Sequence, residues 1–76
     1  MRTITDSNFM QWTAFVSTGK QGYSNDPHFV FQCMSQPTVR PRWTPADGDE
    51  SDAQAALVKM SASELQGTFE RSVDLP

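Results

Sequence analysis

The chain has 76 residues, of which 37% are hydrophobic and 11% aromatic, and its formal charge at neutral pH is -3. A chain of this length forms at most one domain, so we expect residues 1–76 to be a single small domain whose core uses large aromatic side chains. The acidic balance argues against a general nucleic-acid binder. The single cysteine excludes an internal disulfide framework, and no apolar run is long enough to cross a membrane, so we expect a cytoplasmic protein.

Three segments have the side-chain alternation of β-strands. Residues 11–18 (QWTAFVST) and 28–35 (HFVFQCMS) are rich in aromatic and β-branched types, and residues 38–44 (TVRPRWT) alternate along their whole length. The segment 19–27 contains two glycines and a proline and is typical of a loop. Pro41 cannot donate to a ladder, so the third strand should lie at an edge or pair through one side only.

After residue 45 the spacing of apolar residues becomes helical. The first set consists of Ala53, Ala56, Leu57 and Met60. A helix that continued past residue 60 would carry its next apolar set on the opposite side, so we predict two helices, about 51–60 and 62–72. Ser61 and Glu64 have the spacing of a capping box, which supports a new helix start there. A single helix kinked at Ser61 is the alternative.

These elements predict an α+β fold, with a three-stranded antiparallel β-meander followed by two short C-terminal helices packed on one sheet face. The expected core consists of Trp12, Phe29, Phe31, Trp43, Leu57, Leu65 and Phe69. The uncovered sheet face would then carry Val30, Gln32, Met34, Arg40 and Arg42. An uncovered face with apolar content beside an edge strand can dock a protein partner, so these five residues are the candidate partner-binding set.

The run ADGDESD at residues 46–52 is the densest group of carboxylates in the chain. As a calcium loop of the EF-hand type starting at Asp47, it would need a bidentate Glu at its twelfth position, where Val58 stands. A helix start explains the run without further requirements, with Asp49 or Ser51 as the cap and acidic residues near the positive helix end. We therefore interpret the run as the start of the first helix.

Cys33 and His28, the residues most capable of nucleophilic and base chemistry, have opposite parity in the second strand. Such residues point to opposite sheet faces, so a Cys–His pair is excluded unless a bulge intervenes. Cys33 shares its parity with Phe29 and Phe31, which predicts a buried thiol. One His and one Cys do not fill a structural zinc site, and the Gly-Lys pair at 19–20 lacks the rest of a phosphate-binding loop. We expect no catalytic residue, cofactor or metal site.

The leading hypothesis is therefore a small non-enzymatic protein-binding or accessory, regulatory module. Its partner would be another protein, or a second copy bound through the uncovered face. The alternative is a binder of single-stranded nucleic acid that uses the Arg40/Arg42 sheet face, although Trp43 points the other way and the net charge disfavours it. An enzyme would require an active site assembled across a subunit interface.

Overall fold

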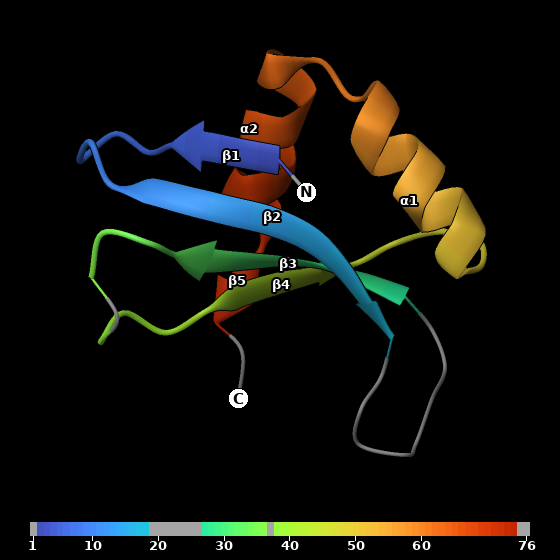
Figure 1. Cartoon of the computed structure of the whole chain (residues 1–76), viewed down its shortest axis with the longest axis horizontal. Coiled ribbons are helices and arrows are strands. Elements are labelled where there is room, and N and C mark those ends of the chain that lie inside the picture. The colour runs from blue at the N-terminus through green and yellow to red at the C-terminus, as the bar shows by residue number, and fades with distance from the viewer. Residues whose placement is uncertain (1, 19–26, 37, 75–76) are drawn as a thin grey trace.

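An antiparallel sheet and two helices make up the described part of the chain, residues 2–18, 27–36 and 38–74 (Figure 1). In this computed structural model the five strands follow one another across the sheet in chain order. The elements are β1 (Arg2–Thr5), β2 (Gln11–Thr18), β3 (Pro27–Cys33), β4 (Arg42–Pro45), α1 (Glu50–Lys59), α2 (Ala62–Arg71) and β5 (Val73–Asp74). The α+β class with an antiparallel sheet is confirmed, and the expected three-stranded meander is the centre of a larger sheet with one short strand added at each edge.

The third predicted strand differs most from its expected bounds. β4 begins at Arg42, and Pro41 lies immediately before it. β4 pairs with β3 on one side and with β5 on the other, so the expectation of an edge strand is wrong. Because Pro41 precedes the ladder, its missing N–H removes no ladder hydrogen bond. Of the loop predicted for 19–27, residues 19–26 lie outside the described residues, and Pro27 is the first residue of β3.

Both helices begin at capping boxes. Asp49 caps α1, where its side chain accepts from the Asp52 N–H at 2.9 Å and the Asp52 side chain accepts from the Asp49 N–H at 3.3 Å. Ser61 and Glu64 exchange the corresponding bonds at 3.1 Å each at the start of α2, as their spacing predicted. Met60 between the helices has extended backbone angles, so the two-helix prediction is confirmed and the single kinked helix is wrong. Among the described residues, no helix is long and apolar enough to cross a membrane.

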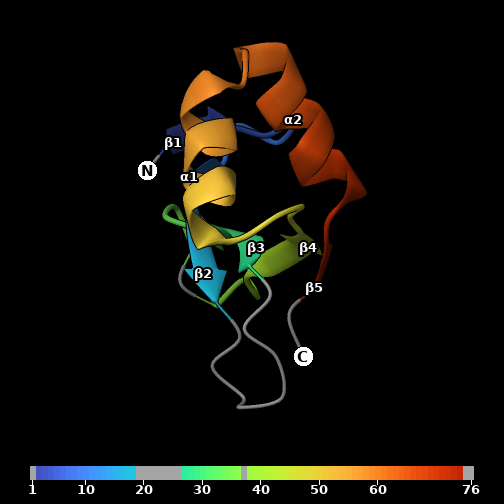
Figure 2. The ribbon, with the colours of Figure 1, turned by 90° about the vertical axis from the view of Figure 1, so that its right-hand side faces the viewer.

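The hydrophobic core lies between the helices and one face of the sheet. Figure 2 shows α1 and α2 on the same side of β2, β3 and β4. The buried cluster contains Ile4, Trp12, Ala14, Phe29, Phe31, Cys33, Ala53, Leu57 and Leu65. The Phe69 ring packs against this cluster, with its centroid 4.9 Å from that of Trp12 and 5.3 Å from that of Phe31. The predicted core is confirmed for these residues, and Trp43 is the exception.

Arg2 joins the first strand to the end of α1. Its Nη1 donates to the Leu57 carbonyl at 2.9 Å and to the Met60 carbonyl at 2.8 Å. The last carbonyl groups of a helix accept no hydrogen bond within the helix and carry partial negative charge. A guanidinium at this end donates hydrogen bonds to them and interacts favourably with the helix dipole. This contact explains why so short a strand has a fixed place at the edge of the sheet.

Candidate interaction surface

The register of β4 determines which sheet face each predicted binding residue occupies. Residues directly opposite each other in an antiparallel ladder have their side chains on the same face. Arg42 is opposite Phe31, and Trp43 is opposite Val30. Because Phe31 is fully buried beneath the helices, Arg42 lies on the helix-covered face and Trp43 on the other, which we call the open face. The predictions that Trp43 is in the core and that Arg42 is on the uncovered face are therefore wrong.

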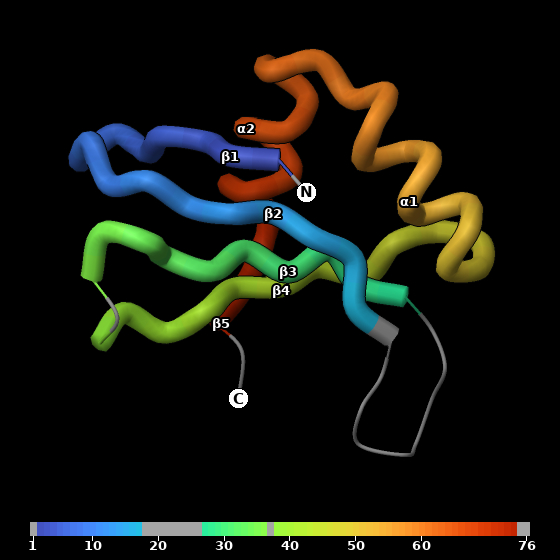
Figure 3. Tube along the Cα trace, in the orientation of Figure 1, coloured from blue at the N-terminus to red at the C-terminus, as the bar shows by residue number. Residues whose placement is uncertain are grey.

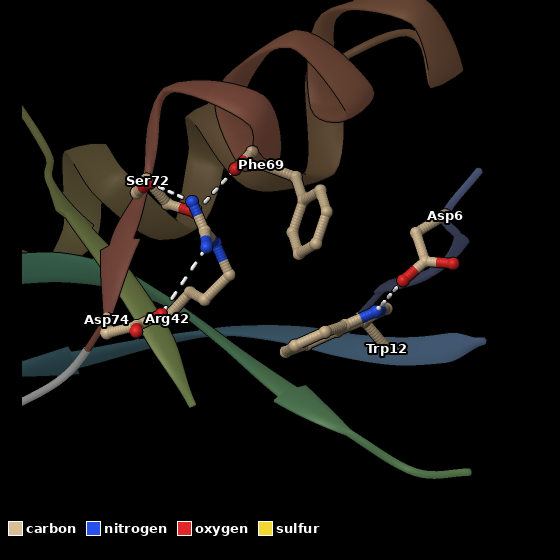
Figure 4. A network of polar contacts seen from close by, with 6 residues as sticks. All are labelled: Asp6, Trp12, Arg42, Phe69, Ser72 and Asp74. Atoms are coloured by element: carbon tan, nitrogen blue, oxygen red, sulfur yellow. Dashed lines mark hydrogen bonds and ion pairs between the residues drawn. The ribbon is translucent and has the colours of Figure 1, made fainter. Parts of the chain in front are cut away.

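Arg42 binds the C-terminal end of α2 (Figure 4). Its Nε donates to the Ser72 hydroxyl at 2.9 Å, and its Nη2 donates to the Ser72 carbonyl. The Ser72 hydroxyl in turn donates to the Phe69 carbonyl in the last turn of the helix. The guanidinium carbon lies 5.4 Å from the centroid of the Phe69 ring, and Nη1 is 3.4 Å from an Asp74 carboxylate oxygen. Arg42 thus joins β4 to α2 and β5, as Arg2 joins β1 to α1.

Two other predicted binding residues, Met34 and Arg40, lie outside the sheet, in the segment between β3 and β4. Arg40 is exposed and precedes β4, while Met34 is 60% exposed and follows β3. This loop and the β1–β2 turn lie at the same end of the sheet (Figure 3). A shallow groove of about 440 Å³ at this end has a lining that includes Asp6, Asn8, Trp12, Val39, Arg40, Phe69 and Glu70. Positively and negatively charged side chains both line the groove, so it does not favour a ligand of either charge.

The Asp6 carboxylate organises the turn between β1 and β2. One oxygen accepts the backbone N–H groups of Asn8 at 2.8 Å and Met10 at 3.0 Å, and the other accepts the Trp12 indole N–H at 2.9 Å. The indole hydrogen bond, followed by those from the backbone, holds the pKa of Asp6 below its usual value. Phe9 at the tip has φ of 63° and is 87% exposed, so this polar network maintains a backbone conformation that aromatic residues rarely adopt.

The open face has an apolar row that crosses four strands. Phe15 of β2 is opposite Val30 of β3, Val30 is opposite Trp43 of β4, and Trp43 is opposite Val73 of β5. Directly opposite side chains in a ladder are in contact range, so these residues form one continuous band, the apolar row. Val30 in its middle is 7% exposed, whereas Val73 at its end is 60% exposed.

Uncharged polar residues border the apolar row on both sides. One border consists of Ser17 and His28 and is continued on β4 by the apolar Pro45, and the other consists of Thr3, Thr13 and Gln32. The His28 ring stacks on Trp43, with 4.5 Å between ring centroids and 18° between ring planes. Val30 and Gln32 lie on the side of the sheet away from the helices, as predicted, but Val30 is buried there and not exposed.

No described Asp, Glu, Lys or Arg occupies an open-face position in this register; Lys20 and Asp26 lie outside the described residues. In a chain with 20% charged residues, this is the feature that distinguishes the open face from the rest of the described surface. Depletion of charge around a core of aromatic residues is typical of the centre of a protein interface.

The reactive side chains are kept apart. Cys33 is 5% exposed on the helix-covered face, where its Sγ lies 3.9 Å from the Met10 Sδ, while His28 lies on the open face. The opposite-face prediction for this pair is therefore confirmed. In the acidic run, Asp49 and Asp52 form the cap of α1, which confirms the helix start. Within residues 2–18, 27–36 and 38–74, no group of three or more His, Cys, Asp or Glu side chains could hold a metal ion.

Comparisons with known proteins add no functional information to this geometry. No family model matches the chain, and no curated protein or solved structure matches it significantly.

Sequence reasoning missed three members of the apolar row, namely Phe15, Trp43 and Val73. The alternation within each strand correctly predicts which residues of the same strand share a face with Phe15 and with Trp43. The alternation does not say which of the two faces the helices cover, and this choice decides whether Trp43 or Arg42 is open to a partner. Val73 belongs to a strand of two residues, which is too short to show any period.

Proposed function

We propose that this protein is a non-enzymatic protein-binding module that binds its partner through the open face of its sheet. The observation that carries the proposal is the apolar row bordered by uncharged polar residues. A partner that covers this row removes aromatic and aliphatic surface from water without burying any charged side chain described on that face.

The nucleic-acid alternative loses support from the same geometry. A binder of single strands combines rings on which bases stack with cations that contact the phosphates. Here Trp43 and Phe15 lie on the open face, whereas Arg42 is bonded to the end of α2 on the other face. The aromatic residues and the arginine therefore do not form one surface, so we do not propose nucleic acid as the partner.

A matched pair of variants tests the role of the open face. The face variant, Gln32→Lys/Val73→Lys, adds two positive charges to that face at exposed positions. The helix control, Gln54→Lys/Val58→Lys, makes the same two changes at exposed positions of α1. Net charge and composition are therefore identical in the two variants.

The assay is capture from nuclease-treated native extract with tagged wild type, face variant and helix control as baits. We expect a protein, which includes the untagged chain itself, to be retained by the wild type and the helix control and lost from the face variant. Equal capture by all three baits would contradict the proposal. Capture that disappears on nuclease treatment would instead favour the nucleic-acid alternative.

A further inference from the structure

We infer that the partner of the open face is a second copy of this chain, so that two sheets pack face to face in a two-fold dimer. This inference rests on the proposed function and names its partner. The open face is the one large surface of the described chain that is suited to meet an identical copy of itself, for reasons of charge and pattern.

The first reason is the distribution of charge. The chain carries a formal charge of -3, so two copies repel each other if their acidic surfaces meet. The helix layer holds an acidic group at the start of α1 and further carboxylates on α2: Asp49, Glu50, Asp52, Glu64 and Glu70. The described open face has none. Contact through the open faces therefore puts a neutral surface against a neutral surface and leaves both acidic helix layers outermost.

The second reason is that the pattern of the face is self-complementary. A two-fold axis that lies between the sheets and parallel to the apolar row places the row of one copy on the row of the other. The same rotation brings the border that contains His28 over the border that contains Gln32. Apolar side chains then meet apolar side chains, and uncharged polar side chains meet uncharged polar side chains. Two sheets packed in this way lie about 10 Å apart, with their strands about 30° from parallel.

The area of the open face limits the affinity of this contact. The five strands have between two and eight residues, and at about 3.4 Å per residue and about 4.8 Å between strands they give a face of roughly 400 Å² per copy. Two such faces bury about 800 Å² in total, which is less than a stable interface buries and is typical of a weak, transient one. The dimer is therefore in concentration-dependent exchange with the monomer.

Sedimentation velocity of the purified chain from 1 to about 500 μM tests the inference with the same two variants. We expect the wild type and the helix control to change from monomer to dimer across this range. The face variant places four added positive charges at the interface of a dimer, so we expect its dissociation constant to rise at least about 100-fold. Far-UV circular dichroism and the urea midpoint check that each variant is folded.

A second measurement uses the wild type alone and does not depend on either variant. On dilution, amide resonances of Phe15, Val30, Trp43 and Val73 should shift with the same midpoint as sedimentation, while those on the outer side of α1, such as Val58, stay unchanged. Shifts confined to the helices would overturn the placement of the interface.

The outcomes separate this inference from the proposed function. A wild-type chain that remains monomeric at every concentration overturns the dimer, as does a folded face variant that dimerises as well as the wild type. If the chain is monomeric and still captures a different protein in a manner that depends on the open face, the proposed function stands with another partner. If the face variant also captures that protein as well as the wild type does, both the dimer and the proposed function are wrong.

Discussion

Replacing Arg42 should lower the stability of the fold far more than replacing Arg40, although the two arginines are two positions apart. In Arg42→Ala, the end of α2 loses a charged donor to the carbonyl and hydroxyl of Ser72 and a cation above the Phe69 ring. Hydrogen bonds to charged groups contribute about 1.5–3 kcal/mol, and a cation at a helix C-terminus or over an exposed ring contributes about 0.5–1 kcal/mol.

These contributions overlap because one guanidinium makes all of them. The Arg42 side chain is also 29% exposed, so water replaces part of what is lost, and the pair with the 65%-exposed Asp74 adds little. We therefore expect Arg42→Ala to lower the free energy of unfolding by about 2 kcal/mol, which corresponds to roughly 10 °C in Tm for a domain of this size. Arg42→Lys keeps the charge but loses the planar fork, so about half of the loss is expected.

Urea unfolding followed by far-UV circular dichroism measures these differences without relying on the fluorescence of the neighbouring Trp43. Arg40→Ala is the matched control, because Arg40 is exposed and precedes the strand, and its effect should stay within about 0.5 kcal/mol. If Arg42→Ala is no more destabilising than Arg40→Ala, the guanidinium does not hold the end of α2 and the assignment of Arg42 to the helix-covered face is refuted.

Four further predictions concern single residues. Because its hydrogen bonds lower the pKa of Asp6, this carboxylate stabilises the fold at pH values above its unfolded pKa and ceases to do so as the pH falls through its folded pKa. Asp6→Asn should therefore reduce the urea midpoint at pH 7, and the reduction should shrink as the pH is lowered below the unfolded pKa of Asp6; a loss that does not change with pH would contradict this. Phe9→Gly should raise stability by up to about 1 kcal/mol because it relieves a positive φ. Gly48→Ala should lower it by about 1 kcal/mol or more, because φ is 80° there and an added Cβ would clash with the Asp52 side chain; opposite signs in thermal melts would show the backbone assignment to be wrong. Cys33 should react with a thiol reagent only as fast as the fold opens, so its labelling rate should rise steeply with urea, and rapid labelling without urea would refute its burial.

The features that sequence reasoning recovered are those with a local cause. The boundary between the helices follows from Ser61 and Glu64, which lie three positions apart and need only each other to form a capping box. The strand 11–18 was predicted with its observed bounds because its alternation extends over eight residues. The parity that separates Cys33 from His28 is likewise a property of one extended segment.

The features that it missed depend on partners far away in the sequence. β1 has four residues, and its Arg2 finds its acceptors in Leu57 and Met60. The side of the sheet on which Trp43 lies depends on where α1 and α2 pack, which no pattern within residues 38–44 records. The candidate site was predicted in part for this reason, since Val30 and Gln32 were assigned to the correct face while the residues of β4 were assigned to the wrong one.

The two arginine contacts also place a constraint on the order in which the chain folds. Arg2 is 55 and 58 positions from the residues whose carbonyls it binds, and Arg42 is 30 positions from Ser72, whereas the hairpins of the meander join neighbouring segments. Contacts that close long loops form late, because the loss of chain entropy must first be offset by structure already present. We expect the arginine contacts to form after the rate-limiting step of folding, when the sheet and the helices are already in place. Their removal should then speed unfolding in stopped-flow experiments and leave the rate of folding nearly unchanged. The lifetime of the folded state would accordingly be controlled by two guanidinium groups at the ends of the helices, and only weakly by the local patterns that make its strands and helices recognisable.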